Sequence, residues 1–217
     1  MIDVVVIGVG GSSKVILDIL ESYQYDNAVN IIGFLDDDEN LHGTKFRDKP
    51  IIGSISFLEK LDRKTKVVIA VGATKDVSAR KTIFKKVKEM GFLVHNTISK
   101  DSIISKNVKI GEGCIIMSGV TINSDVVLGD NVFLNTGTIV EHDCVIGDSS
   151  FLATGCVLSG NVKINSNTFM GSNSTVIGNV TIGSGSTVGA GSVVVRDISD
   201  DVLTYGNPSH KNIKELK

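Results

Sequence analysis

An aliphatic residue recurs at every sixth position through the second half of the chain. The series starts at Ile98 and ends at Val194 without an insertion, and all 17 positions hold Ile, Leu, Val or Met. Six residues match neither the 3.6-residue turn of an α-helix nor the two-residue alternation of a long strand. The period fits a short strand and a turn, repeated, with three units closing a triangular coil. We therefore predict a parallel β-helix over residues 98–198, with these anchor side chains pointing inward.

Small or β-branched residues usually stand four places after each anchor, and Gly and Asn are frequent near the expected corners. Gly and Asn tolerate the positive φ that tight corners require. The three cysteines of the chain, Cys114, Cys144 and Cys156, all lie at these small positions. Their number is odd and no CxxC pair exists, so we expect packing rather than a disulfide framework or a metal site.

The first half alternates between strand-like and helix-like segments. Expected strands cover 3–7, 30–35, 51–53 and 66–71, and expected helices cover 14–22, 56–61 and 75–90. Alternating strands and helices predict a parallel sheet covered by helices. We expect an α/β, Rossmann-like nucleotide-binding domain over residues 1–97, too short for a full dinucleotide fold. Residues 199–217 form a C-terminal tail in this division.

A glycine-rich turn follows the first expected strand and contains Gly10, Gly11 and Ser12. Backbone N–H groups and a helix N-terminus meet at such a turn and suit an anion such as a diphosphate. Asp36 and Asp37 follow the second strand, where such folds recognise a ribose or a base. An ordinary strand-to-helix turn would carry the same glycine pattern.

His142 lies in the segment Asn135-Thr-Gly-Thr-Ile-Val-Glu-His-Asp-Cys144. Because Val140 is an inward anchor, Glu141, His142 and Asp143 fall at a corner of the prism. Histidine is the usual general base near neutral pH, and a flanking carboxylate can fix its tautomer. The alternative is a surface histidine between two solvated acids.

Other polar positions carry weaker signals. His42, His95 and His210 are each expected to be structural or solvated, although His42 is near the acidic loop. The basic residues of the expected helix 75–90 suggest a solvated face, to which Arg80 and Lys81 add positive charge that would attract phosphate. That basic set is Lys75, Arg80, Lys81, Lys85, Lys86 and Lys88.

Composition narrows the class of protein. The 217 residues are 41% hydrophobic and 21% charged, with a formal net charge of −2. A nucleic-acid partner would favour a basic surplus, so none is expected. No apolar run approaches the roughly 18 residues of a membrane span. The N-terminus lacks the basic region of a signal peptide, and we expect a cytoplasmic protein.

Taken together, the two halves resemble the sugar acyltransferases of the sialic acid O-acetyltransferase and bacillosamine N-acetyltransferase (NeuD/PglD-like) family. The resemblance covers almost the whole chain. NTGTIVEHDCVIGD at 135–148 is its most specific motif. The other motifs are IGVGGSSK at 7–14, GFLDDDENLHG at 33–43, AVGATKDVSARK at 70–81 and GNPSHKNIK at 206–214.

The resemblance implies a left-handed β-helix, a homotrimer and direct transfer from acetyl-CoA, with no metal. It implies that His142 is the general base and Asp143 the orienting carboxylate, with support from Asn135 and Glu141. The sugar nucleotide is expected on Gly10, Gly11, Ser12, Asp36, Asp37 and Gly72. The acyl donor is expected near Phe151, Gly160, Ser172 and Ala190.

The sequence departs from the family pattern in two places. Ser12 and Ser13 stand where many relatives have a Gly-His pair, and Phe151 stands where a second histidine is common. These departures leave the acceptor open, between a nucleotide-linked amino sugar and a free or CMP-linked sialic acid that would be O-acetylated. A non-sugar acceptor and a non-catalytic trimeric nucleotide-binding scaffold are the remaining alternatives.

Overall fold

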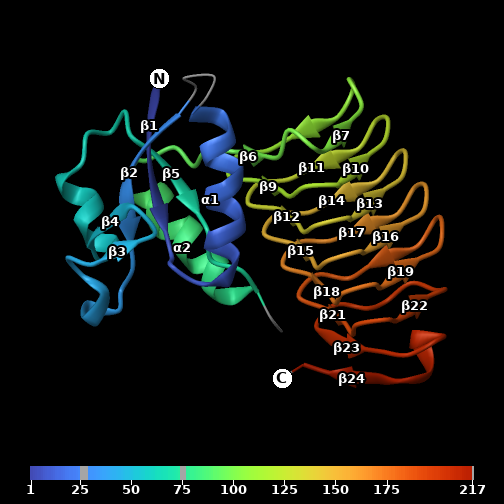
Figure 1. The fold of residues 1–217 in the computed structure, drawn as a ribbon. Coiled ribbons are helices and arrows are strands. Elements are labelled where there is room, and N and C mark those ends of the chain that lie inside the picture. Colours follow the sequence, from blue (N-terminus) through green and yellow to red (C-terminus); the bar gives the residue numbers. More distant parts are fainter. Residues whose placement is uncertain (25–28, 74–76, 217) are drawn as a thin grey trace.

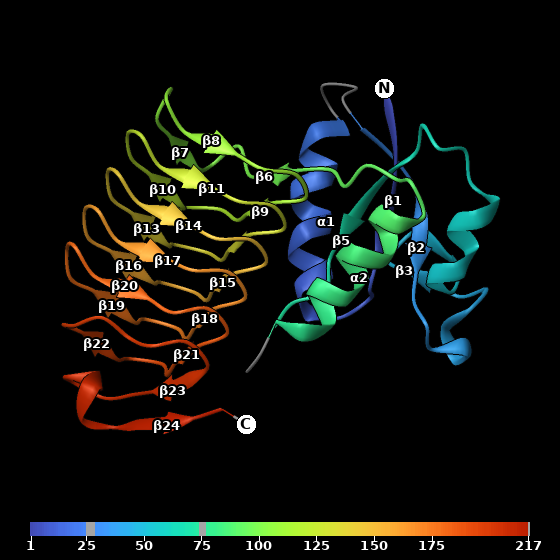
Figure 2. The ribbon, with the colours of Figure 1, turned by 180° about the vertical axis from the view of Figure 1, so that it is seen from behind.

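The protein consists of an α/β unit and a β-helix that lie side by side (Figure 1). The structure is a computed structural model and describes residues 1–24, 29–73 and 77–216. Figure 2 shows from behind that the first face of the β-helix is turned toward helices α1 and α2.

The N-terminal sheet has the strand order β3-β4-β2-β1-β5. Its strands are β1 (Ile2–Ile7), β2 (Val29–Leu35), β3 (Lys45–Phe46), β4 (Lys49–Gly53) and β5 (Lys66–Ile69). Its α-helices are α1 (Gly11–Gln24) and α2 (Ser78–Glu89), and short 3₁₀ segments cover Glu39–Leu41 and Ile55–Lys60.

Alternate residues of β1 point to opposite faces of this sheet, and each face is covered by one helix. Val4 and Val6 pack in a cluster with α1, whereas Val5 and Ile7 pack in a second cluster with α2. All four side chains are at most 1% exposed. Burial on both faces explains why β1 is a continuous apolar run rather than an alternating one.

The sheet departs from the all-parallel prediction at one edge. The sequence reading missed β3, which pairs antiparallel with β4 through a tight hairpin at Arg47, where φ is 50°. Two residues are too few for a periodic signal, and Phe46 is held by a ring contact to Phe34 at 4.9 Å. Helix α2 begins at Ser78, and Lys75 of the expected helix lies outside the described residues.

The second half forms a left-handed β-helix with three faces. The first face holds β6 (Thr97–Ile98), β9 (Ile115–Ile116), β12 (Phe133–Leu134), β15 (Phe151–Leu152), β18 (Phe169–Met170) and β21 (Thr187–Val188). The second face holds β7 (Ile103–Ile104), β10 (Thr121–Ile122), β13 (Ile139–Val140), β16 (Val157–Leu158), β19 (Thr175–Val176) and β22 (Val193–Val194). The third face holds β8 (Lys109–Ile110), β11 (Val127–Leu128), β14 (Val145–Ile146), β17 (Lys163–Ile164) and β20 (Thr181–Ile182).

The prediction that the anchor side chains point into the prism is confirmed. From Ile116 to Val194 every anchor side chain is at most 2% exposed. Ile98, Ile104 and Ile110 are half-buried because they lie in the first coils, at the open end of the prism. Strands 18 residues apart pair in parallel, as Phe133 does with Phe151, so each coil repeats the register of the last.

The β-helix extends beyond residue 198 into the expected tail. β23 (Val202–Thr204) pairs in parallel with β21 and adds to the first face. β24 (Ile213–Glu215) then pairs antiparallel with β23. An antiparallel strand at this end covers a sheet edge that would otherwise be free to pair with another chain.

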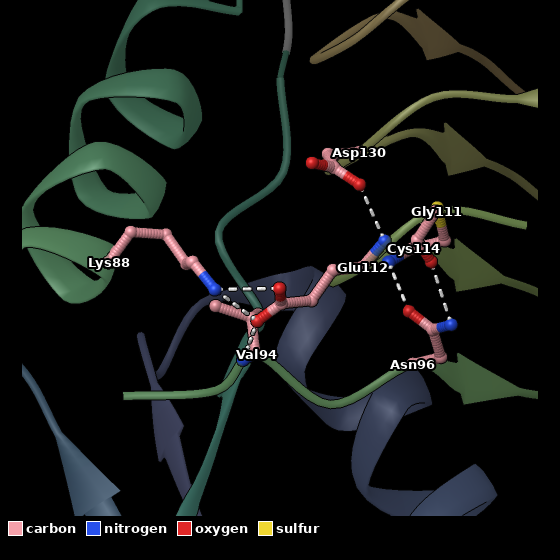
Figure 3. Close-up of polar contacts among 7 residues, drawn as sticks. All are labelled: Lys88, Val94, Asn96, Gly111, Glu112, Cys114 and Asp130. Carbon is pink, nitrogen blue, oxygen red and sulfur yellow. Dashed lines mark hydrogen bonds and ion pairs between the residues drawn. The ribbon is translucent and has the colours of Figure 1, made fainter. Parts of the chain in front are cut away.

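A polar ladder joins the two units at the open end of the prism (Figure 3). The Val94 N–H donates to Oε1 of Glu112 at 2.7 Å, and the Glu112 N–H donates to Oδ1 of Asp130 at 2.7 Å. Lys88 of α2 closes the ladder with an ion pair to Glu112 at 2.6 Å. Val94, Glu112 and Asp130 are 18 residues apart, so the β-helix register already begins in the linker that leaves the first unit.

Candidate active site

His142 and Asp143 lie together on a corner of the β-helix, between β13 of the second face and β14 of the third. Their side chains are 62% and 61% exposed, and Nδ1 of His142 is 2.8 Å from Oδ2 of Asp143. Asp143 has a φ of 60°, a left-handed conformation that Asp tolerates and that the corner requires. With the proton on Nδ1, the ring donates to Asp143 and presents Nε2 as a free acceptor.

The ring of His142 lies directly over Gly160, one coil further along the same corner. A Cβ on Gly160 would be 2.6 Å from both Cε1 and Nε2 of His142. The N–H of Asn161 donates to the His142 carbonyl at 2.9 Å and fixes the backbone of the two coils. The absence of a side chain at Gly160 therefore makes the space that the imidazole occupies.

Asn135 is not brought to His142 within one chain. It follows β12 on the first face and precedes β13, whereas His142 follows β13, so the two stand at opposite ends of one side of the prism. Glu141 is half-buried, and its N–H pairs with the Leu158 carbonyl at 3.0 Å in the regular ladder. The histidine–aspartate pair thus forms one group, and Asn135 belongs to another corner.

Ser172 and Ala190 do come together, at the corner between the first and second faces. They line a cavity of about 420 Å³ whose other walls are mostly apolar. Its remaining lining residues are Phe169, Thr187, Gly189, Leu203 and Leu216. The cavity combines a hydroxyl, glycine backbone and aliphatic side chains, which suits an elongated ligand with alternating apolar and amide segments.

Phe151 lies instead in a stack of three rings on the first face. Its ring centroid is 4.5 Å from that of Phe133 and 5.6 Å from that of Phe169. The α/β unit covers this stack, and Phe151 is only 3% exposed. The structure gives Phe151 a packing role between the two units, with almost no surface left for a ligand.

The glycine turn, Asp36 and Gly72 meet at the edge where β1, β2 and β5 end. Gly10 and Gly11 are exposed and have open space beside them, while Gly72 faces Ser12, whose Oγ would lie 2.5 Å from a Cβ at Gly72. Ser13 is buried, and its hydroxyl donates to the Gly8 carbonyl at 2.8 Å. In parallel sheets this edge is the usual place for a ligand.

The two aspartates also hold the surrounding loops. Asp36 accepts the Val9 N–H at 3.1 Å and the Asp38 N–H at 3.0 Å, and Asp37 accepts the Ile55 N–H at 2.9 Å. His42 Nε2 is 2.8 Å from the Asp36 carbonyl oxygen, which gives His42 a structural contact beside the acidic loop. The edge is therefore pre-organised before any ligand arrives.

The three cysteines are free and fully buried, which confirms their packing role. Burial raises the pKa of Cys114 to about 11 and also raises the pKa of Cys144 and Cys156. Thiols in this state are poor nucleophiles. Across residues 1–24, 29–73 and 77–216, no three His, Cys, Asp or Glu side chains gather as metal ligands would.

The prediction that Arg80 contributes to a phosphate-attracting surface is wrong. Its side chain is only 1% exposed, packed between α2 and the β-helix. The basic residues of this helix do not form one solvated set, because Arg80 is buried whereas Lys81 and Lys85 are exposed. The signal that distinguishes Arg80 is its spacing from Phe84 and Lys88, four and eight residues later, which places all three on one side of the helix.

Within the part of the chain that the structure describes, no helix has both the length and the apolar character needed to cross a bilayer.

Two family models match the chain. Residues 3–87 match the PglD N-terminal domain, and residues 125–160 and 161–196 each match the bacterial transferase hexapeptide (six repeats). A comparison with curated proteins gave no match.

Solved structures match over nearly the full length. A histidine-to-alanine variant of GDP-perosamine N-acetyltransferase from Caulobacter crescentus, in complex with CoA and GDP-perosamine, is 33% identical with a TM-score of 0.87, covering 98% of this chain and 96% of that one. The acetyltransferase domain of PglB from Neisseria gonorrhoeae FA1090 is 29% identical with a TM-score of 0.86, covering 96% and 98%. WeeI from Acinetobacter baumannii AYE shares the fold, at 20% identity and a TM-score of 0.75 over 99% of this chain and 100% of that one.

Proposed function

Because this chain belongs to the PglD-like family of hexapeptide-repeat sugar acetyltransferases, we propose that it acetylates a nucleotide-linked amino sugar with acetyl-CoA, using His142 as the general base. The observation that carries the proposal is the exposed His142–Asp143 pair, with Nδ1 and Oδ2 2.8 Å apart. The relative at 33% identity was solved with CoA and GDP-perosamine, which supports a nucleotide sugar as acceptor.

The proposed step is direct transfer. Nε2 of His142 takes a proton from the acceptor amine as its nitrogen attacks the thioester carbonyl. The new C–N bond forms, the C–S bond breaks, and the proton returns from His142 to the departing thiolate. Asp143 stabilises the imidazolium and keeps Nε2 aimed outward. A positioned general base of this kind contributes about 10² to 10⁴ in rate.

For acetyl-CoA we propose the corner that carries Ser172 and Ala190. The roughly 420 Å³ cavity there offers aliphatic walls for the pantetheine chain and a hydroxyl and glycine backbone for its amides. For the acceptor we propose the edge that carries Gly10, Gly11 and Ser12, with Asp36, Asp37 and Gly72. Exposed backbone N–H groups at the start of α1 suit a diphosphate.

We also propose that the protein works as a homotrimer. His142 and the Ser172–Ala190 cavity lie at different corners of one chain. In our proposal, a neighbouring copy therefore brings the acyl donor in its own cavity next to His142. The outward residues of the second face carry no charge, and Ile103 and Ile139 are 68% and 37% exposed. That face consists of Ile103, Thr121, Ile139, Val157, Thr175 and Val193. A continuous β-branched surface of this kind favours association between copies.

We further propose a role in surface glycan or polysaccharide synthesis and a cytoplasmic location. Free cysteines such as the three in this chain are typical of a reducing compartment. O-acetylation of a free or CMP-linked sialic acid remains the alternative reaction, because His142 would serve a hydroxyl acceptor as well as an amine.

The test measures thiol release from acetyl-CoA with a panel of UDP-, GDP-, CMP- and dTDP-linked amino sugars and free sialic acid. A thiol reagent reads CoA release without interference because the protein's own thiols are buried. Wild type is expected to turn over one acceptor, and His142→Ala to lose at least about 10²-fold in kcat while keeping its oligomeric state. Asp143→Asn should lose less. Full activity of His142→Ala would refute the role of His142 as general base. No thiol release by the wild type with any acceptor of the panel would refute the proposed acceptor class.

A further inference from the structure

Arg80 is a buried cation that contacts both units of the protein, and none of its hydrogen-bond partners among the described residues is a carboxylate. It lies in the first turn of α2 and is 1% exposed. Burial lowers its pKa to about 10, so the guanidinium still carries its charge at neutral pH. A buried charge is costly unless hydrogen bonds compensate it, so its partners define what the residue does.

Two of those partners are the last residue of β5 and a residue of the loop that follows it. Nη1 of Arg80 donates to the Ile69 carbonyl and, at 3.4 Å, to the Val71 carbonyl. Val71 immediately precedes Gly72, which closes against Ser12 of the glycine turn. Arg80 therefore holds the backbone that leads into the edge proposed for the acceptor.

The other partners belong to the β-helix. Nη2 donates to the Gly113 carbonyl at 3.0 Å, and Nε lies 3.5 Å from the Asn131 carbonyl. The guanidinium carbon is 5.3 Å from the centre of the Phe133 ring, close enough for a cation–π contact. The planar guanidinium of Arg80 thus donates to backbone carbonyls on two coils of the β-helix, at the end of β5 and in the loop that follows it.

Lys88 provides a contrasting contact between the same units. It pairs with Glu112 at the other end of α2, and Glu112 in turn accepts the Val94 N–H (Figure 3). Lys88 holds α2 and the linker on the β-helix, yet no hydrogen bond or ion pair joins its side chain to the described residues of the loop after β5. Docking of the units and placement of the loop can therefore be tested separately.

We propose that Arg80 is a positioning residue that fixes the Val71–Gly72 loop relative to the β-helix, and thereby sets where the acceptor meets the acyl donor. The inference rests on the proposed acceptor edge. A guanidinium is suited to this role because its planar fork of donors defines directions, which the single ammonium of lysine does not. Misplacement by about 1 Å is enough to cost 10²-fold in rate.

The experiment compares Arg80→Met and Arg80→Lys with Lys88→Met as the docking control and exposed Lys85→Met as the helix control. Arg80→Met is expected to raise the acceptor KM by about tenfold or more and to lower kcat, with the acetyl-CoA KM within twofold of wild type. Arg80→Lys should recover part of the loss, and it serves as the main variant if Arg80→Met does not fold. Lys88→Met should lower the melting temperature without this change in acceptor KM.

Amide hydrogen exchange of residues 71–73 gives a readout that needs no turnover. It should accelerate in Arg80→Met and stay as in wild type in Lys88→Met. An unchanged acceptor KM with unchanged exchange would overturn the inference, and so would an equal effect of Lys88→Met. If wild type has no activity on any acceptor, the proposed function fails by itself, and the exchange of the loop still decides whether Arg80 positions it.

Discussion

At the residue scale, the proposed role of His142 as a general base depends on the residues that lie next to it in the neighbouring coils. Ser124, His142 and Gly160 occupy the same corner in successive coils. The imidazole has room only because Gly160 has no side chain, and its orientation follows from Asp143 in a left-handed conformation. The sequence reading assigned Gly160 to the acyl donor, and the structure adds its contact with the proposed base.

Gly160→Ala should therefore displace the imidazole without disturbing the coil. The new methyl would meet Cε1 and Nε2 at 2.6 Å, and the ring can rotate away because it is exposed. We expect kcat to fall by about tenfold to a hundredfold with little change in melting temperature. Gly178→Ala, one coil further on, is the control because its methyl would lie 3.1 Å from the Gly160 carbonyl oxygen and would not meet the His142 ring. Equal loss in the two variants would contradict the steric explanation.

We expect His95 to make the stability of the folded protein sensitive to mild acid. Burial and the nearby Lys66 charge lower the pKa of His95 below its ordinary 6.5, so the folded protein takes up this proton at lower pH than the unfolded chain. The stability that neutral His95 contributes is complete above pH 6.5 and is lost as pH falls through the folded pKa. Melting temperatures between pH 7.5 and 5 should fall less steeply for His95→Gln and for Lys66→Gln. If the melting temperature of His95→Gln fell with pH as steeply as that of wild type, His95 would not be the cause of the acid sensitivity.

At the element scale, each strand from β6 to β22 has two residues, and the second of them is the anchor that points into the prism. In β17, Ile164 points inward and is 1% exposed, while its neighbour Lys163 is exposed on the outside. The six-residue period could be read from the sequence because the inward anchors recur without interruption. β3 could not be read, since two residues outside any repeat leave no periodic signal.

Substitutions at Ile164 and Lys163 of β17 measure separately what an inward and an outward side chain contribute to stability. Ile164→Ala should lower the free energy of unfolding by about 2–5 kcal/mol through lost burial and the cavity left behind. Lys163→Ala in the same strand should change it by less than about 0.5 kcal/mol. Denaturant unfolding of both variants at matched protein concentration measures the difference, and similar losses would show that the anchors do not carry the core.

At the scale of the whole molecule, one chain presents an incomplete site. His142 projects from the corner between the second and third faces, whereas the cavity with Ser172 and Ala190 opens at the corner between the first and second. The second face between them is apolar or threonine at every outward position. In our proposal, assembly of copies through this face completes the site.

Two threonines six residues apart provide a matched test of that assembly. Thr175→Asp places a charge on the second face, two coils from His142, and should yield smaller species by light scattering together with loss of turnover. Thr181→Asp places the same charge on the third face and should retain both assembly and activity. Assembly retained by Thr175→Asp would exclude the second face as the interface.

The sequence by itself determined the features that depend on local period and residue type. The unbroken anchors predicted the β-helix and the corner of His142, and alternating strands and helices predicted the α/β unit, because burial imposes its period directly on the chain. Only the tertiary structure decided which residues meet across the two units. It buried Arg80 among carbonyls of the β5 end and the β-helix, and it covered the ring of Phe151 with the α/β unit. These outcomes depend on how one unit packs on the other, and such contacts between distant segments leave no periodic trace in the sequence.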